Sequence, residues 1–150
     1  MYDFNVGDDA LRDRLYLNDG KGNFSIASES LPIEAFPTGT VQVADLNFDG
    51  NPDLFVGARI DPGQFPTSLG ARIWINDGKG NFTDQTKQLA PTFVNLGMLT
   101  DSGFADLDLD GKPELIVVGE AMPIQIFSFQ NGSWQETTLN YFEKHEFGFW

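Results

Sequence analysis

The heptapeptide NDGKGNF occurs at residues 18–24 and again at residues 76–82. Asp-Gly followed by a second glycine, between two runs of β-forming residues, is typical of a hairpin turn, because glycine adopts positive φ without steric cost. A turn needs only two or three special residues, so a longer identical stretch indicates that the surrounding unit is duplicated. A weaker third turn follows at residues 130–134, with the sequence QNGSW.

An acidic motif alternates with these turns. Residues 44–57 read ADLNFDGNPDLFVG, and residues 105–119 read ADLDLDGKPELIVVG. The order along the chain is therefore turn, acidic motif, turn, acidic motif, turn. This order indicates an internal repeat of about 55–60 residues, a period typical of solenoids and propellers.

One repeat contains four short runs of strand character. Residues 40–44 alternate in the period-2 pattern of a strand and lead into the acidic loop, and residues 53–57 and 71–75 are apolar runs. Residues 81–86 begin with the last two residues of the second NDGKGNF segment. No sustained helical period accompanies them. We therefore predict an all-β fold made of four-stranded antiparallel β-propeller blades. The heptapeptide would join the third and fourth strands of a blade, and Phe24, Phe82 and Trp134 would anchor the fourth strands in the core between blades.

The expected blades divide the chain, residues 1–150, into one propeller segment. A partial blade spans about residues 1–30, with strands at 2–6, 13–17 and 23–27. Complete blades follow at about 40–86 and 99–138, and residues 147–150 begin a further first strand. About three blades are too few for a ring, which needs four to eight. Either the chain is a fragment of a longer propeller, or copies close the ring as a homo-oligomer, most simply a dimer joined head to tail through the C-terminal strand.

The composition limits the partners. The chain has 22 acidic and 9 basic residues, a formal net charge of −13 and no cysteine. Such a charge disfavours nucleic acid and anionic membranes, and the lack of cysteine excludes disulfides and thiolate metal sites. No apolar run approaches the roughly 20 residues of a membrane span. A protein or carbohydrate ligand remains as the expected partner, without membrane insertion.

The acidic motifs place oxygen-bearing side chains at positions 1, 3, 5 and 9 of a loop, with glycine at position 6. This matches the first part of an EF-hand loop and suits a hard cation, best calcium. The plain alternative is an acidic turn, since Asp and Gly are common in turns. Two copies at blade spacing favour two Ca²⁺ sites. Valine stands at position 12 and strands flank both loops, so an EF-hand is not expected. The predicted side-chain ligands are Asp45, Asn47, Asp49 and Asp53 in the first loop and Asp106, Asp108, Asp110 and Glu114 in the second, with the backbone carbonyls of Asn51 and Lys112.

The acidic motif, a strand and the N-D-G-x-G-x-F turn together resemble FG-GAP/VCBS repeats, over about residues 15–134. Residues 56–58 (VGA) and 103–105 (GFA) match the family's named elements only in part. The resemblance implies a seven-bladed propeller of the kind in integrin α-subunit heads and in secreted bacterial proteins. It also implies calcium loops between the first and second strands of a blade, with Glu114 departing from the usual Asp. An extracellular or periplasmic location follows, with the cell surface as an option. The first ten residues, MYDFNVGDDA, do not form a signal peptide.

We find no catalytic constellation. His145 is the only histidine, and the glycine-rich turns lead into strands among acids, unlike phosphate loops. Residues 120–123 are expected to form a loop that turns the chain toward residues 124–127. The chain is therefore expected to be a calcium-stabilised binding module and not an enzyme. The alternative is a propeller portion, catalytic or not, of a larger secreted enzyme such as a polysaccharide lyase or sugar dehydratase.

Overall fold

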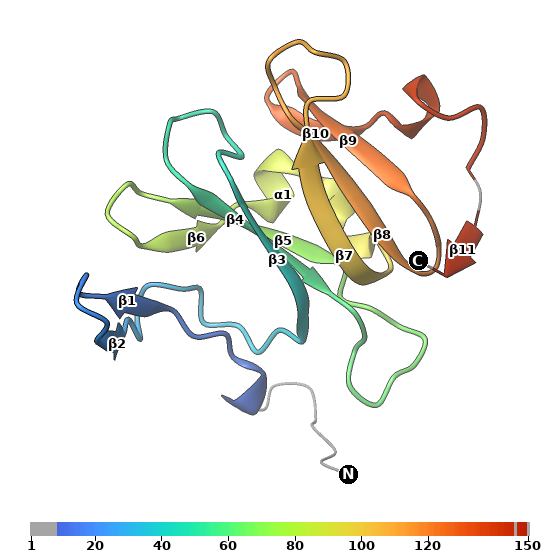
Figure 1. Ribbon diagram of the computed structural model, residues 1–150. Helices are drawn as coiled ribbons and strands as arrows, with labels where there is room; N and C mark the ends of the chain where they lie inside the picture. The colour runs from blue at the N-terminus through green and yellow to red at the C-terminus, as the bar shows by residue number, and fades with distance from the viewer. Residues whose placement is uncertain (1–8, 146, 150) are drawn as a thin grey trace.

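A four-stranded and a five-stranded antiparallel sheet form the body of the molecule (Figure 1). The structure is a computed structural model that describes residues 9–145 and 147–149. The first sheet has the order β3 (Thr38–Ala44), β4 (Asp53–Ala58), β5 (Ala71–Asn76) and β6 (Phe82–Asp84). The second has β7 (Met98–Ala105), β8 (Glu114–Pro123), β9 (Gln125–Gln130) and β10 (Ser133–Glu136) in the same sequential pairing.

The remaining elements are short. A separate hairpin consists of β1 (Tyr16–Asn18) and β2 (Phe24–Ile26), and β11 (Phe147–Phe149) pairs with the end of β8. The only α-helix among the described residues is α1 (Thr86–Leu89), and the 3₁₀ turns are η1 (Asp9–Leu11), η2 (Pro91–Asn95) and η3 (Thr138–Asn140). No helix in this part of the chain has the length and apolarity to cross a membrane. The all-β prediction is confirmed, whereas the described strands do not close a ring.

The two NDGKGNF segments fold alike. In the second, the Asp77 amide donates to the Asn81 carbonyl at 3.0 Å, and the Asn81 side-chain amide donates to the Asp77 carboxylate at 2.8 Å. The first copy repeats these contacts at 3.0 and 2.7 Å, between Asp19 and Asn23. The third turn is also a hairpin, with φ of 52° at Asn131 and 81° at Gly132. All three predicted turns are therefore confirmed.

A threonine after the fourth strand extends the similarity between the sheets. The Thr86 hydroxyl accepts a hydrogen bond from the Ile73 amide at 2.9 Å, and the Thr138 hydroxyl accepts one from the Ile126 amide at 3.0 Å. Each hydroxyl also donates to the acid two residues before it, Asp84 in one case and Glu136 in the other. Both sheets thus end by turning the chain back over β5 or β9.

The main core lies between the two sheets. It contains Phe55 and Ile73 from the first sheet, Leu115 and Phe127 from the second, and Phe93 from the connection. The rings of Phe55, Phe93 and Phe127 meet edge to face, with centroids 5.8 and 4.9 Å apart. Burial of this aromatic and aliphatic surface is the main force that holds one sheet on the other.

The opposite face of the first sheet has a smaller core of Phe36, Val56, Ala58 and Trp74. The segment between β2 and β3 covers it, and there Glu34 receives a bidentate hydrogen bond from Arg72 at 2.8 and 3.2 Å. Arg72 also lies over the Phe36 ring, 4.7 Å from its centroid. The segment between β2 and β3 covers only part of this face.

Two local expectations were wrong. Phe24 is 65% exposed instead of anchored in a core, because no sheet covers its hairpin among the described residues. Residues 120–123 belong to strand β8 and not to a loop. Ala121 has φ of 53° and is skipped in the pairing with β11, so a local bulge lets the strand continue.

The C-terminal strand is present over residues 147–149, where it pairs with β8 and is the fifth strand of the second sheet. The predicted strand at residues 2–6 and Trp150 lie outside the described residues. The third expected blade is therefore represented here only by the β1–β2 hairpin.

Candidate metal centre in the acidic loops

The two acidic loops join the first and second strands of each sheet and share one backbone conformation. At position 4, Phe48 and Leu109 both have φ of 62°, and at position 6, Gly50 and Gly111 have φ of 91° and 87°. A bulky residue in the left-handed region is rare and needs a surrounding structure that fixes it. The repeated conformation shows that the loops are one motif used twice.

Carboxylates hold this conformation by accepting backbone hydrogen bonds. At position 1, Asp45 accepts from the Gly50 amide at 2.8 Å, and Asp106 accepts from the Gly111 amide at 3.0 Å. At position 5, Asp49 and Asp110 each accept from the amide two residues later at 2.8 Å. The acids therefore shape the turn as well as supplying oxygen atoms.

The acid at position 9 differs between the loops. Asp53 is fully buried, and its two oxygens accept from the Leu46 amide at 2.9 Å and the Asn76 amide at 2.8 Å. Glu114 is 3% exposed, and within the described residues one of its oxygens accepts a backbone hydrogen bond, from Leu107 at 2.8 Å. Asp53 thus ties its loop to the following hairpin, whereas the longer Glu114 keeps an oxygen for another partner.

Carboxylates converge in the second loop. Asp106, Asp108 and Glu114 each offer one ligand oxygen, and these atoms lie within 4.8 Å of one another. Asp110 does not join this group, and no such group of three acids forms in the first loop within the described residues. The structure therefore brings together three of the predicted side chains of the second loop. The first-loop ligands Asp45, Asn47, Asp49 and Asp53, and the carbonyls of Asn51 and Lys112, stay predictions.

Protonation differs within the first loop. Burial raises the pKa of Asp53, although its two backbone hydrogen bonds oppose this, and the charges of Asp49 and Asp45 add to the rise. The pKa of Asp49 is lowered, first by the hydrogen bond from the Asn47 side chain and then by the Asn51 amide. The exposed acid of this loop is therefore the more readily ionised one.

Aromatic contacts hold the first loop against the second sheet. The Trp134 indole donates to the Leu46 carbonyl at 3.0 Å, and the Phe48 and Phe129 rings are 5.1 Å apart. Lys112 of the second loop lies 6.0 Å from the Phe48 ring centroid, so the two loops are neighbours. The sequence analysis did not predict these contacts. The aromatic residue at position 4 of the first loop, Phe48, is the feature of the sequence that could have indicated them.

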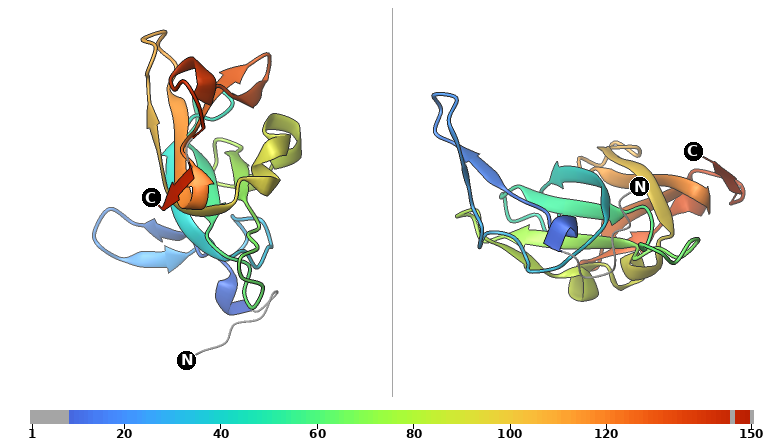
Figure 2. Two further views of the ribbon diagram at one scale, coloured as in Figure 1. Left: turned by 90° about the vertical axis from the view of Figure 1, so that its right-hand side faces the viewer. Right: turned by 90° about the horizontal axis from the view of Figure 1, so that it is seen from below.

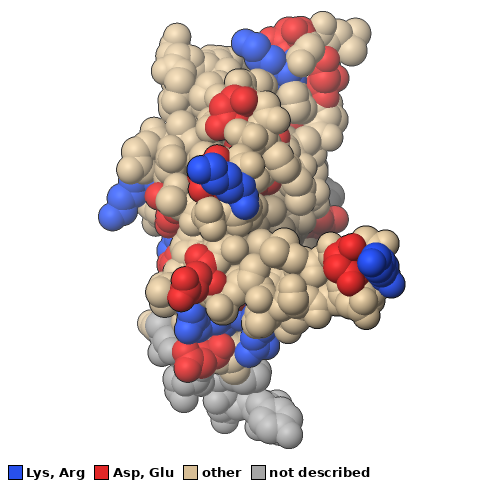
Figure 3. Space-filling model, turned by 90° about the vertical axis from the view of Figure 1, so that its left-hand side faces the viewer, with Lys and Arg blue, Asp and Glu red and all other residues tan. Residues whose placement is uncertain are grey.

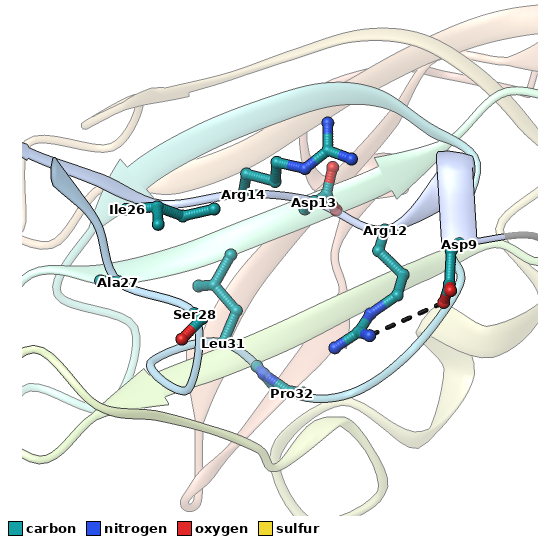
Figure 4. A pocket seen from close by; sticks show the side chains of 9 residues that line it. All are labelled: Asp9, Arg12, Asp13, Arg14, Ile26, Ala27, Ser28, Leu31 and Pro32. Carbon is teal, nitrogen blue, oxygen red and sulfur yellow. Dashed lines mark ion pairs between the residues drawn. The ribbon is translucent and has the colours of Figure 1, made fainter. Parts of the chain in front are cut away.

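A hollow with a volume of about 270 Å³ lies beside the N-terminal hairpin, and none of its lining residues belongs to the acidic loops (Figure 4). Arg12 pairs with Asp9 at its edge, with 3.7 Å between nitrogen and oxygen, and Arg14 also contributes to its lining. Burial raises the pKa of Asp13, which accepts a hydrogen bond from Thr38. Two acidic and two basic side chains line this hollow, so their formal charges balance.

Comparison with known families decides the relationship. The model of the FG-GAP-like repeat matches residues 2–56 and again residues 63–117. The chain belongs to the FG-GAP-like repeat family. The two matches include the first acidic loop and the second, respectively, in agreement with the duplication seen in both sequence and backbone. No curated protein and no solved structure shows significant similarity to the chain.

Proposed function

We propose that this FG-GAP-like segment is a calcium-stabilised, propeller-type interaction module that works outside the cell and binds a protein or carbohydrate ligand. The observation that carries the calcium part is the convergence of Asp106, Asp108 and Glu114 within 4.8 Å. FG-GAP-like repeats are typical of extracellular interaction modules, which supports the location and the role. No observation favours a catalytic role or a larger enzyme over this one.

The donor set fits a hard cation. Like charges about 4 Å apart repel by about 1 kcal/mol in water and by more near a protein surface, so a divalent ion would relieve an unfavourable arrangement. All three donors are carboxylate oxygens. Calcium tolerates such a site, whereas magnesium requires short, octahedral contacts.

The two loops should differ in affinity. In the second loop, Asp106 and Glu114 each use one oxygen for a backbone amide and keep the other. In the first loop, both oxygens of Asp53 already accept backbone hydrogen bonds. A cation bound to Asp53 would share an oxygen that already accepts a buried hydrogen bond, which leaves less electron density for the ion, so we assign the tighter site to the second loop.

Isothermal titration calorimetry with calcium tests this proposal. We expect two sites, of which Asp106→Asn removes the tighter and Asp45→Asn the weaker. Glu29→Gln is the control, because Glu29 is exposed and lies outside both loops. This substitution removes one negative charge, as the other two do, but it removes no predicted calcium ligand. Absence of calcium binding, or equal binding by all three variants and the parent chain, would contradict the proposal.

A further inference from the structure

The third hairpin turn contains the single Asn-Gly pair of the sequence, Asn131–Gly132. Both residues have positive φ, 52° and 81°, and the flanking strands pair from Gln130 and Ser133 outward, so the turn is of type I′. Both central residues are exposed, and a Cβ atom built on Gly132 meets nothing within 4 Å. Figures 1 and 2 show this turn at the end of the second sheet that also carries the second acidic loop.

An asparagine followed by glycine can lose its side-chain amide without an enzyme. The backbone nitrogen of the glycine attacks the side-chain carbonyl carbon, a C–N bond forms, and the side-chain nitrogen leaves as ammonia with the proton of the attacking amide. The product is a five-membered succinimide ring. Water then adds to one of its two carbonyl carbons, and ring opening gives either aspartate or isoaspartate. Glycine permits this attack best, because it has no side chain beside the nucleophilic nitrogen.

The sequence also contains four Asp-Gly pairs, and in each of them hydrogen bonds hold both groups that would react. The glycine amide donates to an upstream side chain: Gly20 to Asn18 at 2.8 Å, Gly50 to Asp45 at 2.8 Å, Gly78 to Asn76 at 3.0 Å and Gly111 to Asp106 at 3.0 Å. The aspartate carboxylate accepts from the amide two residues later: Asp19 at 2.7 Å, and Asp49, Asp77 and Asp110 at 2.8 Å. In these pairs the nucleophilic nitrogen and the side-chain carbonyl are therefore both restrained.

Neither reacting group of the third turn is restrained in this way. Within the described residues, the Gly132 amide makes no hydrogen bond, and neither does the Asn131 side chain. No protein hydrogen bond has to break before the two groups meet, and the open space around Gly132 leaves room for the ring. The turn thus combines the most reactive sequence with the least restrained geometry among the acid-Gly and Asn-Gly pairs of the chain.

We propose that Asn131–Gly132 is a site of spontaneous deamidation, which converts Asn131 to aspartate and isoaspartate as the protein ages. Isoaspartate routes the main chain through the former side chain and lengthens it by a methylene group, which a two-residue type I′ turn does not accommodate. The turn leads directly to Trp134, whose indole donates to the Leu46 carbonyl at 3.0 Å. Isoaspartate therefore loosens the contact between β10 and the first acidic loop.

The aspartate product has a smaller effect. It adds one negative charge to a chain whose formal charge is already −13. Acidic side chains are also spread over the side of the molecule seen in Figure 3, so one more carboxylate is a small relative change. An aspartate at this position keeps the length of the turn, and the chain already uses Asp-Gly in its other two hairpin turns.

Incubation of the whole chain in warm buffer, at neutral and at mildly alkaline pH, tests the proposal. Mass spectrometry of tryptic peptides locates each lost amide, and labelling with protein isoaspartate methyltransferase detects isoaspartate. We expect Asn131 to lose its amide ahead of the other nine asparagines. The rate should rise at alkaline pH, because base removes the proton of the attacking nitrogen. The aged protein should have a lower Tm than fresh protein, since its altered turn no longer matches the hairpin.

Asp77→Asn provides a matched control within the same protein. It creates a second Asn-Gly pair, in which the glycine amide still donates to Asn76 and the new side-chain oxygen can accept from the Lys79 amide. This second pair should react about tenfold more slowly than Asn131–Gly132, because a hydrogen bond to the nucleophile must break first. In concentrated guanidinium chloride the two pairs should react at similar rates, which would attribute the difference in the native protein to the fold.

Three results would overturn the proposal. The first is an intact Asn131 amide after prolonged incubation, and the second is a loss at Asn131 that is no faster than at the other asparagines. The third is an equal rate for the two Asn-Gly pairs of the native Asp77→Asn variant, which would mean that hydrogen bonding within the turns does not decide where the chain deamidates.

Discussion

Gly111 occupies a backbone conformation that other residues adopt only at a cost. Its φ is 87°, and a Cβ atom built there meets nothing within 4 Å, so the cost of substitution comes from the backbone alone. Gly103, in β7 of the same sheet, is also open to a Cβ atom but lies outside the positive-φ region. These two glycines therefore form a matched pair for measuring what the loop conformation requires.

Gly111→Ala should destabilise the fold by about 1–2 kcal/mol, the usual cost of the left-handed conformation for an L-residue. Gly103→Ala should be neutral or stabilise by about 0.5–1 kcal/mol, since alanine loses less entropy in a strand. Urea denaturation at fixed calcium concentration measures both. Equal midpoints for the two variants would mean that the loop does not impose its geometry on Gly111.

At the level of single residues, the spacing of the acids predicted the motif, but it did not predict the different roles of the two acids at position 9. Asp53 and Glu114 occupy the same motif position, yet one is tied to two backbone amides and the other joins a cluster of acids. The amide of Asn76 decides this difference, and it lies on a strand that spacing within the loop does not reveal.

Trp134 and Trp74 show what a single hydrogen bond contributes between elements. Both indoles are 2% exposed. Trp134 joins β10 to the first acidic loop by donating to the Leu46 carbonyl, whereas the buried Trp74 indole nitrogen has no hydrogen-bond partner among the described residues. Replacement by phenylalanine removes the same atoms at both sites and leaves an unpaired acceptor only at Leu46.

Trp134→Phe should therefore cost about 1–2 kcal/mol more than Trp74→Phe, because a buried carbonyl loses its donor in one case and an unpaired donor is removed in the other. Guanidinium denaturation followed by circular dichroism gives the two free energies of unfolding. A larger loss for Trp74→Phe would show that volume, and not the hydrogen bond, dominates at these positions.

The strands and their order were predictable because each repeat carries its own period-2 pattern and its own turn. The expected strands at 53–57 and 71–75 differ from β4 and β5 by a single residue at their ends. Phe24 could not be placed in the same way. Its sequence context matches that of Phe82, but burial depends on a neighbouring sheet, which a local pattern does not report.

At the scale of the whole molecule, the two sheets pack as successive repeats, and this contact buries the largest part of the core. The neighbouring acidic loops lie at one end of that contact, where Lys112 of one approaches Phe48 of the other. Cations in these loops would therefore stiffen the junction between the sheets as well as each sheet.

Thermal unfolding in excess calcium and in excess chelator tests the proposal that calcium in these loops stabilises the fold. Calcium at about a hundred times its dissociation constant should add about 2.7 kcal/mol for each occupied site, because the unfolded chain does not gather the ligands. We predict a clearly higher Tm in calcium than in chelator, with magnesium producing little of the effect. Identical unfolding curves in calcium and in chelator would contradict a stabilising role of calcium.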